Sequence, residues 1–340
     1  MSSPPRAAAT ASTLTRERLD MLLGAAARSR VVIVGDAMLD VYLHGDVERI
    51  SPEAPVPVVR VRARRSALGG AANVAQNVVA LGAKAELVCV VGKDAGAAEL
   101  ARMLAAIGAQ GRSVIAVDRA TTTKTRVLAR VQQVVRVDEE EDADLTGDDA
   151  AQLLAAARRA IDDGDALVLE DYNKGVLVPR LIEDVIAHAR RRGIPVVVDP
   201  KYRNFFSYRG ATVFKPNRRE LEAALGAAVD LDHPEALPAV LARLDVEHLL
   251  LTLGERGMVL ADRNGMLDRI PATAREVYDV VGAGDTVTAY LAAMLAAGAT
   301  PREAAEVANL AAGVEVGKLG AASVRPDEVR ASHRAWLDRG

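Results

Sequence analysis

The sequence predicts an α/β fold, in which a doubly wound, mainly parallel sheet is flanked by helices and carries a small β lid. Short β-branched apolar runs alternate with helical patterns from Val31 onward, and this alternation is typical of βαβ units. Glycine-rich turns open helices directly after strands. Two segments rich in β-branched residues and arginine, at about 42–64 and 121–138, interrupt the alternation and predict the lid as a small antiparallel flap that stands off the main sheet.

The alternating elements can be placed in chain order. Strands are expected at residues 31–35, 87–91, 166–169, 196–199, 211–214 and 249–253. Helices are expected at residues 15–27, 71–81, 95–107 and 179–192, and another is expected to carry the apolar run 287–295. Ligands of such sheets bind beyond the carboxyl ends of the strands. Polar residues that follow strands are therefore the candidates for function.

Composition bounds the organisation of the chain. Its 340 residues are 50% hydrophobic, which is enough for one large domain, expected at 15–340. Residues 1–14, rich in Ser, Pro, Ala and Thr, are expected to be a disordered tail. Aromatic residues make up only 3%, so the core must consist mainly of Ala, Val and Leu.

Charge and hydropathy exclude several classes of protein. There are 43 basic and 46 acidic residues, a net charge of −3, which argues against a nucleic-acid partner because such binding needs a basic surface. No apolar run reaches the ~20 residues that span a bilayer, and the N-terminus lacks the apolar core of a signal peptide. We expect a cytoplasmic protein without a membrane partner. The single cysteine, Cys89, lies in an apolar run and is expected to be a buried strand residue.

The turn at residues 279–286, DVVGAGDT, is the most informative segment. The first amides of a helix lack internal partners and carry the positive end of its dipole, so Gly282, Ala283 and Gly284 can form an anion hole. Asp285 is well placed there to take a proton from a hydroxyl group that attacks the anion. The segment therefore predicts phosphoryl transfer with Asp285 as base. The alternative is a plain strand-to-helix connection, in which an aspartate complements the dipole.

Two segments are candidates for binding a sugar. Asp40 follows the first strand, where its carboxylate can accept hydrogen bonds from hydroxyl groups; the alternative is a capping aspartate. Gly69 and Gly70 open a helix and allow a ligand to approach closely, and Asn73 offers both a donor and an acceptor. Helix packing explains the neighbouring alanines equally well.

Two further segments are candidates for binding a nucleotide. Asn217 and Glu220 have the spacing of a capping box; the functional alternative places them near Mg²⁺ and the phosphates, largely through water. A glycine-rich turn after a later strand suits backbone contacts with the nucleotide. The nucleotide-binding candidates are Lys215, Asn217, Arg218, Arg219, Glu220, Thr252, Gly254, Gly257 and Asn309. The metal candidates are Asn217 and Glu220.

Other motifs are missing. The first strand is not followed by the G-x-G-x-x-G of dinucleotide-binding proteins, which excludes a nicotinamide-dependent dehydrogenase. The segment Gly313–Lys318 has too few residues between its glycines for a P-loop.

Taken together, Gly69-Gly70 with Asn73, Asn217-x-x-Glu220 and the 279–286 turn resemble the motifs of the ribokinase-like (PfkB) family of sugar kinases, from about residue 31 to 324. The resemblance implies a doubly wound sheet with a β lid, ATP and Mg²⁺ as the phosphoryl donor, and Asp285 as the base. A regulatory protein that kept the fold and lost catalysis is the alternative; the intact Asp285 and its turn count against it.

Marker segments within this family suggest the substrate. RISPEAPVPV at 49–58, Thr123-Lys124, Gln132-Gln133 with Arg136, and Asp171-Tyr172-x-Lys174-Gly175 look like those of bacterial kinases that phosphorylate D-glycero-β-D-manno-heptose 7-phosphate at O1, in ADP-heptose and lipopolysaccharide core synthesis. The chain resembles the stand-alone form, which implies a separate adenylyltransferase and a phosphatase as pathway neighbours. A kinase of the same fold that acts on another sugar or sugar phosphate is the alternative.

The resemblance also implies which residues bind the substrate. The substrate-binding candidates are Asp40, Gly69, Gly70, Asn73, Arg136, Asp171, Lys174, Lys201 and Arg203. Among them, Lys174, Arg136, Lys201 and Arg203 are candidates for the distal phosphate, because Arg and Lys are the usual phosphate ligands. We also expect a homodimer formed through the lid. Backbone carbonyl groups around residues 279–281 are candidates for a monovalent-cation site.

Overall fold

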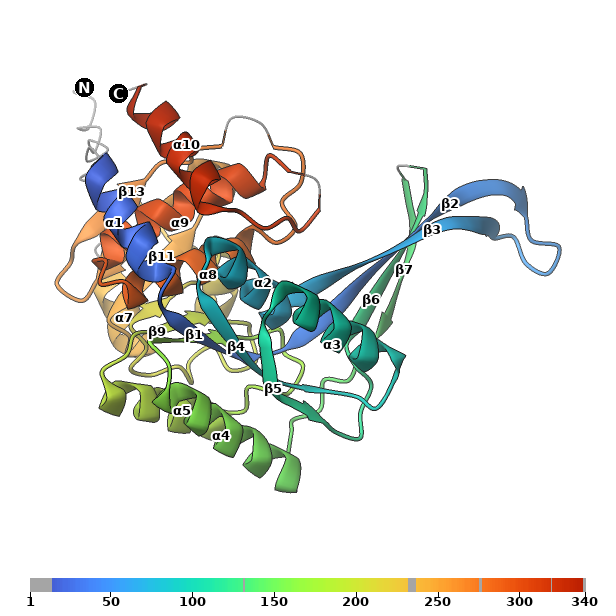
Figure 1. The fold of residues 1–340 in the computed structure, drawn as a ribbon, viewed down its shortest axis with the longest axis horizontal. Helices are drawn as coiled ribbons and strands as arrows, with labels where there is room; N and C mark the ends of the chain where they lie inside the picture. The colour runs from blue at the N-terminus through green and yellow to red at the C-terminus, as the bar shows by residue number, and fades with distance from the viewer. Residues whose placement is uncertain (1–13, 131, 232–236, 275–276, 319, 339–340) are drawn as a thin grey trace.

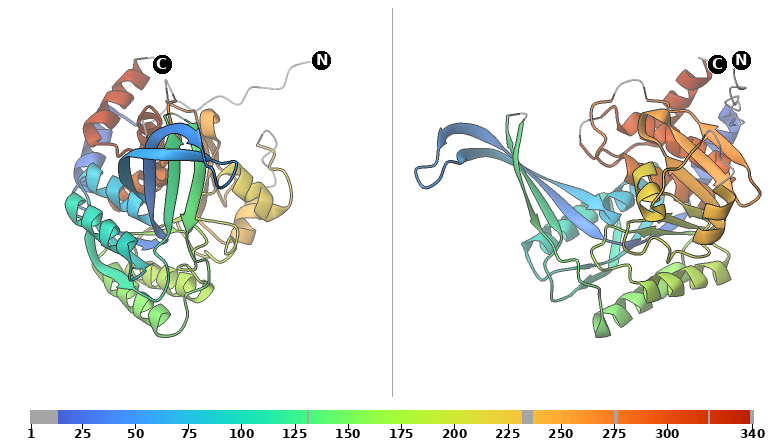
Figure 2. Two further views of the ribbon diagram at one scale, coloured as in Figure 1. Left: turned by 90° about the vertical axis from the view of Figure 1, so that its right-hand side faces the viewer. Right: turned by 180° about the vertical axis from the view of Figure 1, so that it is seen from behind.

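The computed structural model describes residues 14–130, 132–231, 237–274, 277–318 and 320–338. A nine-stranded sheet lies between two layers of helices, and a four-stranded sheet projects from this body (Figures 1 and 2). The predicted fold class, a mostly parallel doubly wound sheet flanked by helices, is confirmed.

The large sheet contains all the predicted strands. Its spatial order is β13 (Leu267–Ile270), β12 (Met258–Asp262), β11 (His248–Thr252), β10 (Val213–Phe214), β9 (Val196–Asp199), β8 (Ala166–Glu170), β1 (Arg30–Gly35), β4 (Lys84–Val91) and β5 (Gln110–Ala116). Neighbouring strands from β11 to β5 are parallel. At the other edge, β12 and β13 are antiparallel, and a 3₁₀ turn, η2 (Gly254–Arg256), links β11 to β12.

Helices cover both faces of this sheet. One face packs against α1 (Arg16–Ala26), α2 (Ala71–Leu81), α3 (Ala95–Ile107), α8 (Ala283–Ala296), α9 (Pro301–Glu315) and α10 (Pro326–Leu337). The other packs against α4 (Gly147–Asp162), α5 (Pro179–Arg192), α6 (Arg218–Leu225) and α7 (Leu237–Leu244). Ile33 faces the first layer and Val32 the second. The central strands are apolar on both sides because both sides are covered.

The N-terminal helix begins slightly later than predicted. Thr15 is the N-cap of α1, and its hydroxyl group accepts a hydrogen bond from the Arg18 amide at 3.1 Å. Leu14, the last residue of the expected tail, is buried, with 2% of its surface exposed. The rest of that tail, residues 1–13, lies outside the described residues.

The projecting sheet consists, in spatial order, of β3 (Pro57–Gly70), β2 (Ala37–Ile50), β6 (Thr123–Ala129) and β7 (Gln132–Glu139). We predicted an antiparallel flap, and this is wrong for the central pair, because β2 and β6 are parallel. Both of these strands run outward from the body, whereas β3 and β7 run back towards it. Met38 pairs with Gly69 near the base of the sheet, so the two predicted sugar-binding segments lie together where the projecting sheet meets the body.

Candidate active site

The predicted anion hole lies at the N-terminus of α8. Gly282 is its N-cap, with a φ of 93°, and the first helical hydrogen bond runs from the Thr286 amide to the Gly282 carbonyl oxygen at 2.9 Å. The amides of Gly284 and Asp285 precede this bond and point along the positive end of the helix. A Cβ atom at residue 282 would lie 3.0 Å from Nδ2 of Asn73. Both the backbone conformation and the close approach therefore require glycine here.

Asp285 lies in the first turn of α8, and only 5% of its surface is exposed. Nδ2 of Asn73 donates to its Oδ2 at 2.7 Å, and the Tyr172 hydroxyl group donates to its Oδ1 at 2.9 Å. Burial raises the pKa of Asp285 to about 6, helped by the charge of Asp199, while these two hydrogen bonds and Lys215 oppose the rise. The carboxylate can thus exchange a proton near neutral pH.

Two more carboxylates lie beside Asp285, at the ends of neighbouring strands. One oxygen atom each of Glu170, Asp199 and Asp285 lies within 4.8 Å of the others. Burial raises the pKa of Glu170 well above its ordinary value, and the charges of Asp199 and Asp285 raise it further. Nζ of Lys215 is 2.8 Å from Oδ2 of Asp199. A Cβ atom at Gly284 would lie 3.8 Å from that Nζ, so the Lys215 ammonium group is next to the anion hole.

Among the residues that the structure describes, Glu170, Asp199 and Asp285 form the acidic cluster that could hold a metal ion. Oxygen donors are the ligands that Mg²⁺ prefers, and no described residue hydrogen-bonds either carboxylate oxygen of Glu170, which is fully buried. The two predicted metal ligands make other contacts in this structure. Asn217 and Glu220 form the capping box of α6, and Glu220 also pairs with Nζ of Lys201. Of the two roles considered for Asn217 and Glu220, the structure thus contains the helix cap.

The sugar-side candidates meet at the base of the projecting sheet. Asp40 lies on β2, with 7% of its surface exposed, and its carboxylate is paired with the Arg126 guanidinium group of β6. Arg126 also lies over the Tyr42 ring, 5.3 Å from its centre. A Cβ atom at Gly69 would lie 2.7 Å from Oδ2 of Asp40, so glycine leaves room for this carboxylate. Gly70 follows as the N-cap of α2, the helix that carries Asn73.

The four cationic candidates for the distal phosphate all form ion pairs. Lys174 contacts Glu140 at 2.8 Å, a carboxylate that it shares with Lys124 at 3.3 Å. Further pairs are Arg136 with Asp138 at 2.8 Å, Arg203 with Asp142 at 3.0 Å, and Lys201 with Glu220. Lys124 and Lys174 thus meet at one carboxylate. A phosphate group would have to compete with these acidic partners.

Asp171 points into the body rather than into the site. It is 1% exposed and accepts hydrogen bonds from the Tyr208 hydroxyl group at 2.6 Å and the Asn173 amide at 2.7 Å. These bonds fix the loop after β8, and the role of Asp171 in binding substrate stays a prediction.

A cleft of about 630 Å³ adjoins the anion hole. Four of the nucleotide-binding candidates line it, namely Thr252, Gly254, Gly257 and Asn309. Ala283 and Gly284 also line it, together with apolar side chains such as those of Val280, Val287 and Val316. An apolar cleft beside an anion hole suits an adenine base with attached phosphates. Arg218 instead pairs with Glu222 at 2.8 Å, and Arg219 is exposed on α6.

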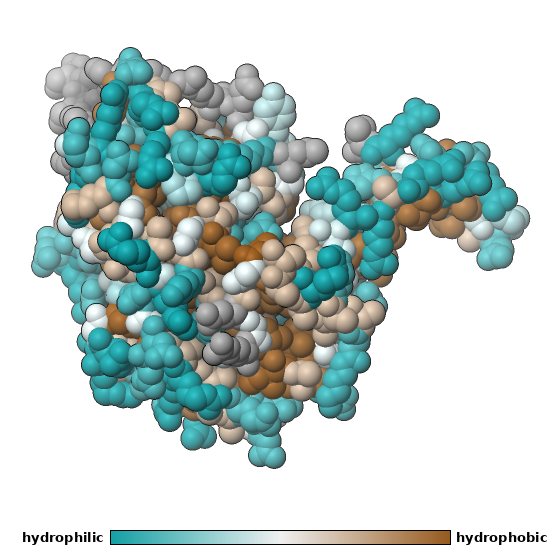
Figure 3. Space-filling view, viewed as in Figure 1, coloured by the Kyte–Doolittle hydropathy of each residue, from teal (hydrophilic) through white to brown (hydrophobic). Residues whose placement is uncertain are grey.

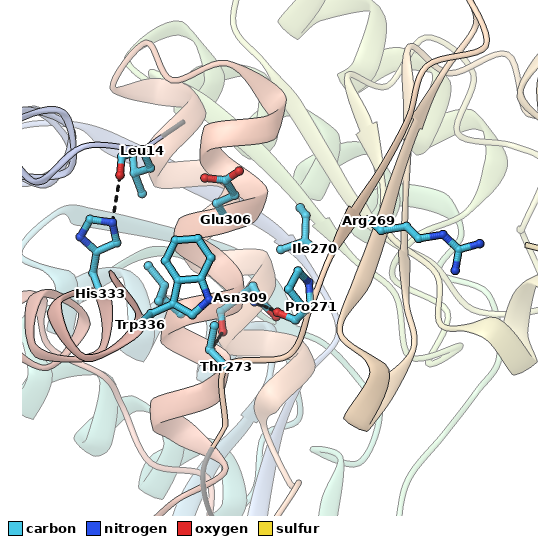
Figure 4. A pocket seen from close by; sticks show the side chains of 10 residues that line it. Leu14, Arg269, Ile270, Pro271, Thr273, Glu306, Asn309, His333 and Trp336 are labelled. Atoms are coloured by element: carbon cyan, nitrogen blue, oxygen red, sulfur yellow. Dashed lines mark hydrogen bonds between the residues drawn. The ribbon is translucent and has the colours of Figure 1, made fainter. Parts of the chain in front are cut away.

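Asn309 also borders a second cavity, shown in Figure 4, between α9 and α10. Its Nδ2 donates to the Pro271 carbonyl oxygen at 2.8 Å. Nε2 of His333 donates to the Leu14 carbonyl oxygen at 3.0 Å on the other side of this cavity. The volume of about 30 Å³ has room for about one water molecule, so the cavity is part of the packing of the chain termini.

Sequence reasoning missed Glu170, Asp199 and Arg126 as parts of the site, and it treated Tyr172 only as a marker. Glu170 and Asp199 are the last residues of β8 and β9, so the rule that function lies at the carboxyl ends of strands would have found them. The sequence carries no comparable signal for the pairing of Arg126 with Asp40.

The fold is similar to that of known sugar kinases. The solved structure of Arabidopsis thaliana ribokinase complexed with ribose and ATP matches with a TM-score of 0.72 at 20% sequence identity, over 90% of this chain and 98% of that one. Phosphofructokinase-2 from Escherichia coli in complex with potassium matches with a TM-score of 0.74 at 20% identity, over 92% of this chain and 100% of that one. The fold is therefore ribokinase-like.

The chain belongs to the pfkB family of carbohydrate kinases, whose model matches residues 28–328. It is a sugar kinase, as the motifs predicted. No helix in the described part of the chain has the length and apolar character that crossing a membrane requires.

Two curated relatives are considerably more similar in sequence to this chain than these two solved structures are. The bifunctional protein HldE of Rhodospirillum rubrum is 46% identical over 320 residues, which cover 92% of this chain and 63% of the relative. The bifunctional protein HldE of Methylococcus capsulatus is 47% identical over 311 residues, which cover 91% of this chain and 65% of the relative. The chain thus spans slightly less than two thirds of the length of these relatives.

Proposed function

We propose that this kinase transfers the γ-phosphoryl group of ATP to O1 of D-glycero-β-D-manno-heptose 7-phosphate. The observation that carries the proposal is the position of Asp285, between the sugar-side residue Asn73 and the amides of an anion hole that opens on the apolar cleft. The marker segments and the relatives named HldE support the choice of heptose 7-phosphate. A phosphatase and an adenylyltransferase are the pathway partners that we propose for the product.

The proposed reaction is an in-line transfer. Asp285 takes the proton of the anomeric hydroxyl group as O1 attacks the γ-phosphorus atom, and the bond to the ADP oxygen breaks. The amides of Gly284 and Asp285 and the Lys215 ammonium group would stabilise the charge on the transferring group. Asp40 and Asn73 would hold the sugar hydroxyl groups, with Arg126 fixing the Asp40 carboxylate.

Mg²⁺ would be held near the acidic cluster, by Glu170 and Asp199, with Asn217 and Glu220 acting through water. Bound there, it would neutralise the negative charge of the phosphate oxygen atoms. The two oxygen atoms of Glu170 that lack hydrogen-bond partners among the described residues support an added cation here, because a buried polar group without a partner is costly.

A monovalent cation is proposed beside the anion-hole turn. Asp279 accepts hydrogen bonds from the amides of Val281 at 3.0 Å and Gly320 at 3.2 Å, which joins this turn to the segment after α9. Burial raises the pKa of Glu315, at the end of α9, to about 8, so a nearby cation would favour its ionised form. Replacing sodium and potassium salts by choline chloride should lower kcat if the site exists, and an unchanged kcat contradicts it.

The projecting sheet is proposed to form a homodimer and to act as the lid that excludes water from the site. Exposed valine and isoleucine side chains support this, including Ile50 at 61%, Val61 at 48%, Val135 at 48% and Val137 at 50%. Figure 3 shows an apolar strip along one side of the projecting sheet. Such a strip is unusual on a surface that faces only water.

ADP release tests the proposed substrate. Purified protein with ATP and Mg²⁺ is compared across heptose 7-phosphate, ribose, fructose 6-phosphate and other sugars and sugar phosphates. We expect the largest kcat/KM with heptose 7-phosphate. A larger value for another acceptor refutes the substrate while keeping the sugar-kinase class, and ATP binding without turnover of any acceptor favours a regulatory protein.

A further inference from the structure

Tyr172 lies in the loop that follows β8, and the backbone fixes its position. Its amide donates to Oδ2 of Asp36 at 2.7 Å, and the same carboxylate accepts from the amides of Lys174 at 3.0 Å and Val176 at 3.3 Å. Asp36 itself is buried, with 1% of its surface exposed. One buried aspartate therefore holds three amides of this loop and sets where the Tyr172 ring stands.

The Tyr172 side chain contacts three parts of the site. Its hydroxyl group donates to Oδ1 of Asp285 at 2.9 Å. A Cβ atom at Gly70 would lie 3.4 Å from its Cδ2 atom, so the ring lies against the sugar-side turn. Nζ of Lys201 lies 5.1 Å from the ring centre and also pairs with Glu220. Tyr172 thus links the proposed base to the sugar side and to the nucleotide side.

Two donors on separate oxygens restrict a carboxylate more than one donor does. The rotation of an aspartate carboxylate about its last side-chain bond is broad, and a single hydrogen bond leaves much of it free. Asn73 holds Oδ2 of Asp285, and its own Oδ1 accepts from Nδ2 of Asn77 at 3.4 Å. With Tyr172 on Oδ1, the plane of the carboxylate is set. A fixed plane keeps the remaining lone pairs directed at one place in the site.

We propose that Tyr172 is a positioning residue for phosphoryl transfer, whose hydroxyl group orients Asp285 towards the acceptor hydroxyl group of the sugar. This rests on the proposed role of Asp285 as base. Asp199, Glu170 and Lys215 also lie near Asp285, and they act on it through their charges. Tyr172 and Asn73, by contrast, donate hydrogen bonds directly to its two oxygen atoms.

The test compares Tyr172→Phe with a matched control. Tyr172→Phe removes the hydroxyl group and keeps the ring beside Lys201. Tyr208→Phe removes another phenol–carboxylate hydrogen bond, which Tyr208 donates to Asp171 at 2.6 Å. Asp171 belongs to the same loop as Tyr172, but this bond does not involve Asp285. The values of kcat and KM are measured with the acceptor that the wild type phosphorylates fastest, for each variant alone and in combination with Asp285→Asn.

We expect Tyr172→Phe to lower kcat by about tenfold to a hundredfold, the effect of losing one hydrogen bond to a charged group, with KM for the sugar changed less than about threefold. Tyr208→Phe should lower the melting temperature and leave kcat near that of the wild type. The variant with both Asp285→Asn and Tyr172→Phe should be no slower than Asp285→Asn alone, because Tyr172 acts through Asp285.

The outcomes separate this proposal from the proposed function. Wild-type turnover by Asp285→Asn would remove the base and overturn both. A loss at Asp285→Asn with an unchanged kcat at Tyr172→Phe would overturn only the role of Tyr172. An equal further loss when Tyr172→Phe is added to Asp285→Asn would also overturn it, because the tyrosine would then act independently of the base.

Discussion

Replacing Asp285 by asparagine should abolish most activity and make the stability of the protein, relative to that of the wild type, increase with pH. Burial raises the pKa of Asp285 from 3.8 to about 6, which corresponds to about 3 kcal/mol. The folded protein holds this proton more tightly than the unfolded chain does. The resulting stability is present below pH ~4 and is lost as the pH rises through about 6. Because asparagine has no charge to bury, the variant does not lose stability in this way as the pH rises.

Urea unfolding between pH 4 and pH 8 measures this effect. The free energy of unfolding of Asp285→Asn minus that of the wild type should grow by up to about 3 kcal/mol over this range. A constant penalty of about 1–3 kcal/mol for the disturbed hydrogen bonds to Asn73 and Tyr172 affects all pH values alike. A difference that does not change with pH would refute the reasoning about burial.

The same variant tests the chemistry. Turnover should fall by ~10²–10⁴-fold, the range for losing a general base, with the affinities for ATP and sugar nearly unchanged in calorimetry. Wild-type activity of the variant would refute the assignment of Asp285 as base. In the wild type, kcat should fall as the pH falls through about 6, because protonated Asp285 cannot accept the proton of the acceptor.

Three more predictions concern the turn, the phosphate and the projecting sheet. Gly282→Ala should destabilise the protein and lower kcat more than the control Gly298→Ala, because both glycines have positive φ (93° and 80°) but only residue 282 has close neighbours; equal effects in chemical unfolding and kinetics would contradict this. Lys174→Ala should raise KM for a phosphorylated sugar more than KM for ATP, and equal changes would argue against a distal-phosphate ligand. Val135→Lys should produce a monomer in light scattering, whereas Met21→Lys, at an exposed apolar position on α1 (56% against 48% for Val135), should leave the dimer intact; a wild-type monomer would refute the proposed interface.

Much of the fold could be predicted because its central strands are short apolar runs between well-marked helices. The bounds of α2, α3, α5 and β9 were predicted to the residue. The strands β5, β12 and β13 were missed, as were helices such as α4, α7 and α10. The edge strand β13 alternates between buried and partly exposed residues, and an amphipathic helix such as α4 buries only one side, so their apolar patterns are weaker. The parallel pairing of β2 with β6 could not be foreseen, because it depends on where both strands leave the body.

The site was predicted best where a single segment carries the chemistry. The turn that contains Gly282 and Asp285 is local, and its geometry follows from two glycines before a helix. The partners of Asp285 come from α2 and from the loop after β8, at sequence separations of 212 and 113 residues. Only the order of the strands brings Asn73 and Tyr172 to it. The cationic residues were the hardest to place, because their ion pairs with nearby acids leave no trace in the sequence pattern.

The most direct test of the central claim is phosphorus NMR of the product formed from ATP, Mg²⁺ and heptose 7-phosphate. We expect a second phosphate ester, coupled to the anomeric proton, with the original ester at C7 unchanged and one ADP formed per product. A new ester at any other carbon, or ADP formed without a second ester, would contradict the proposed transfer to O1.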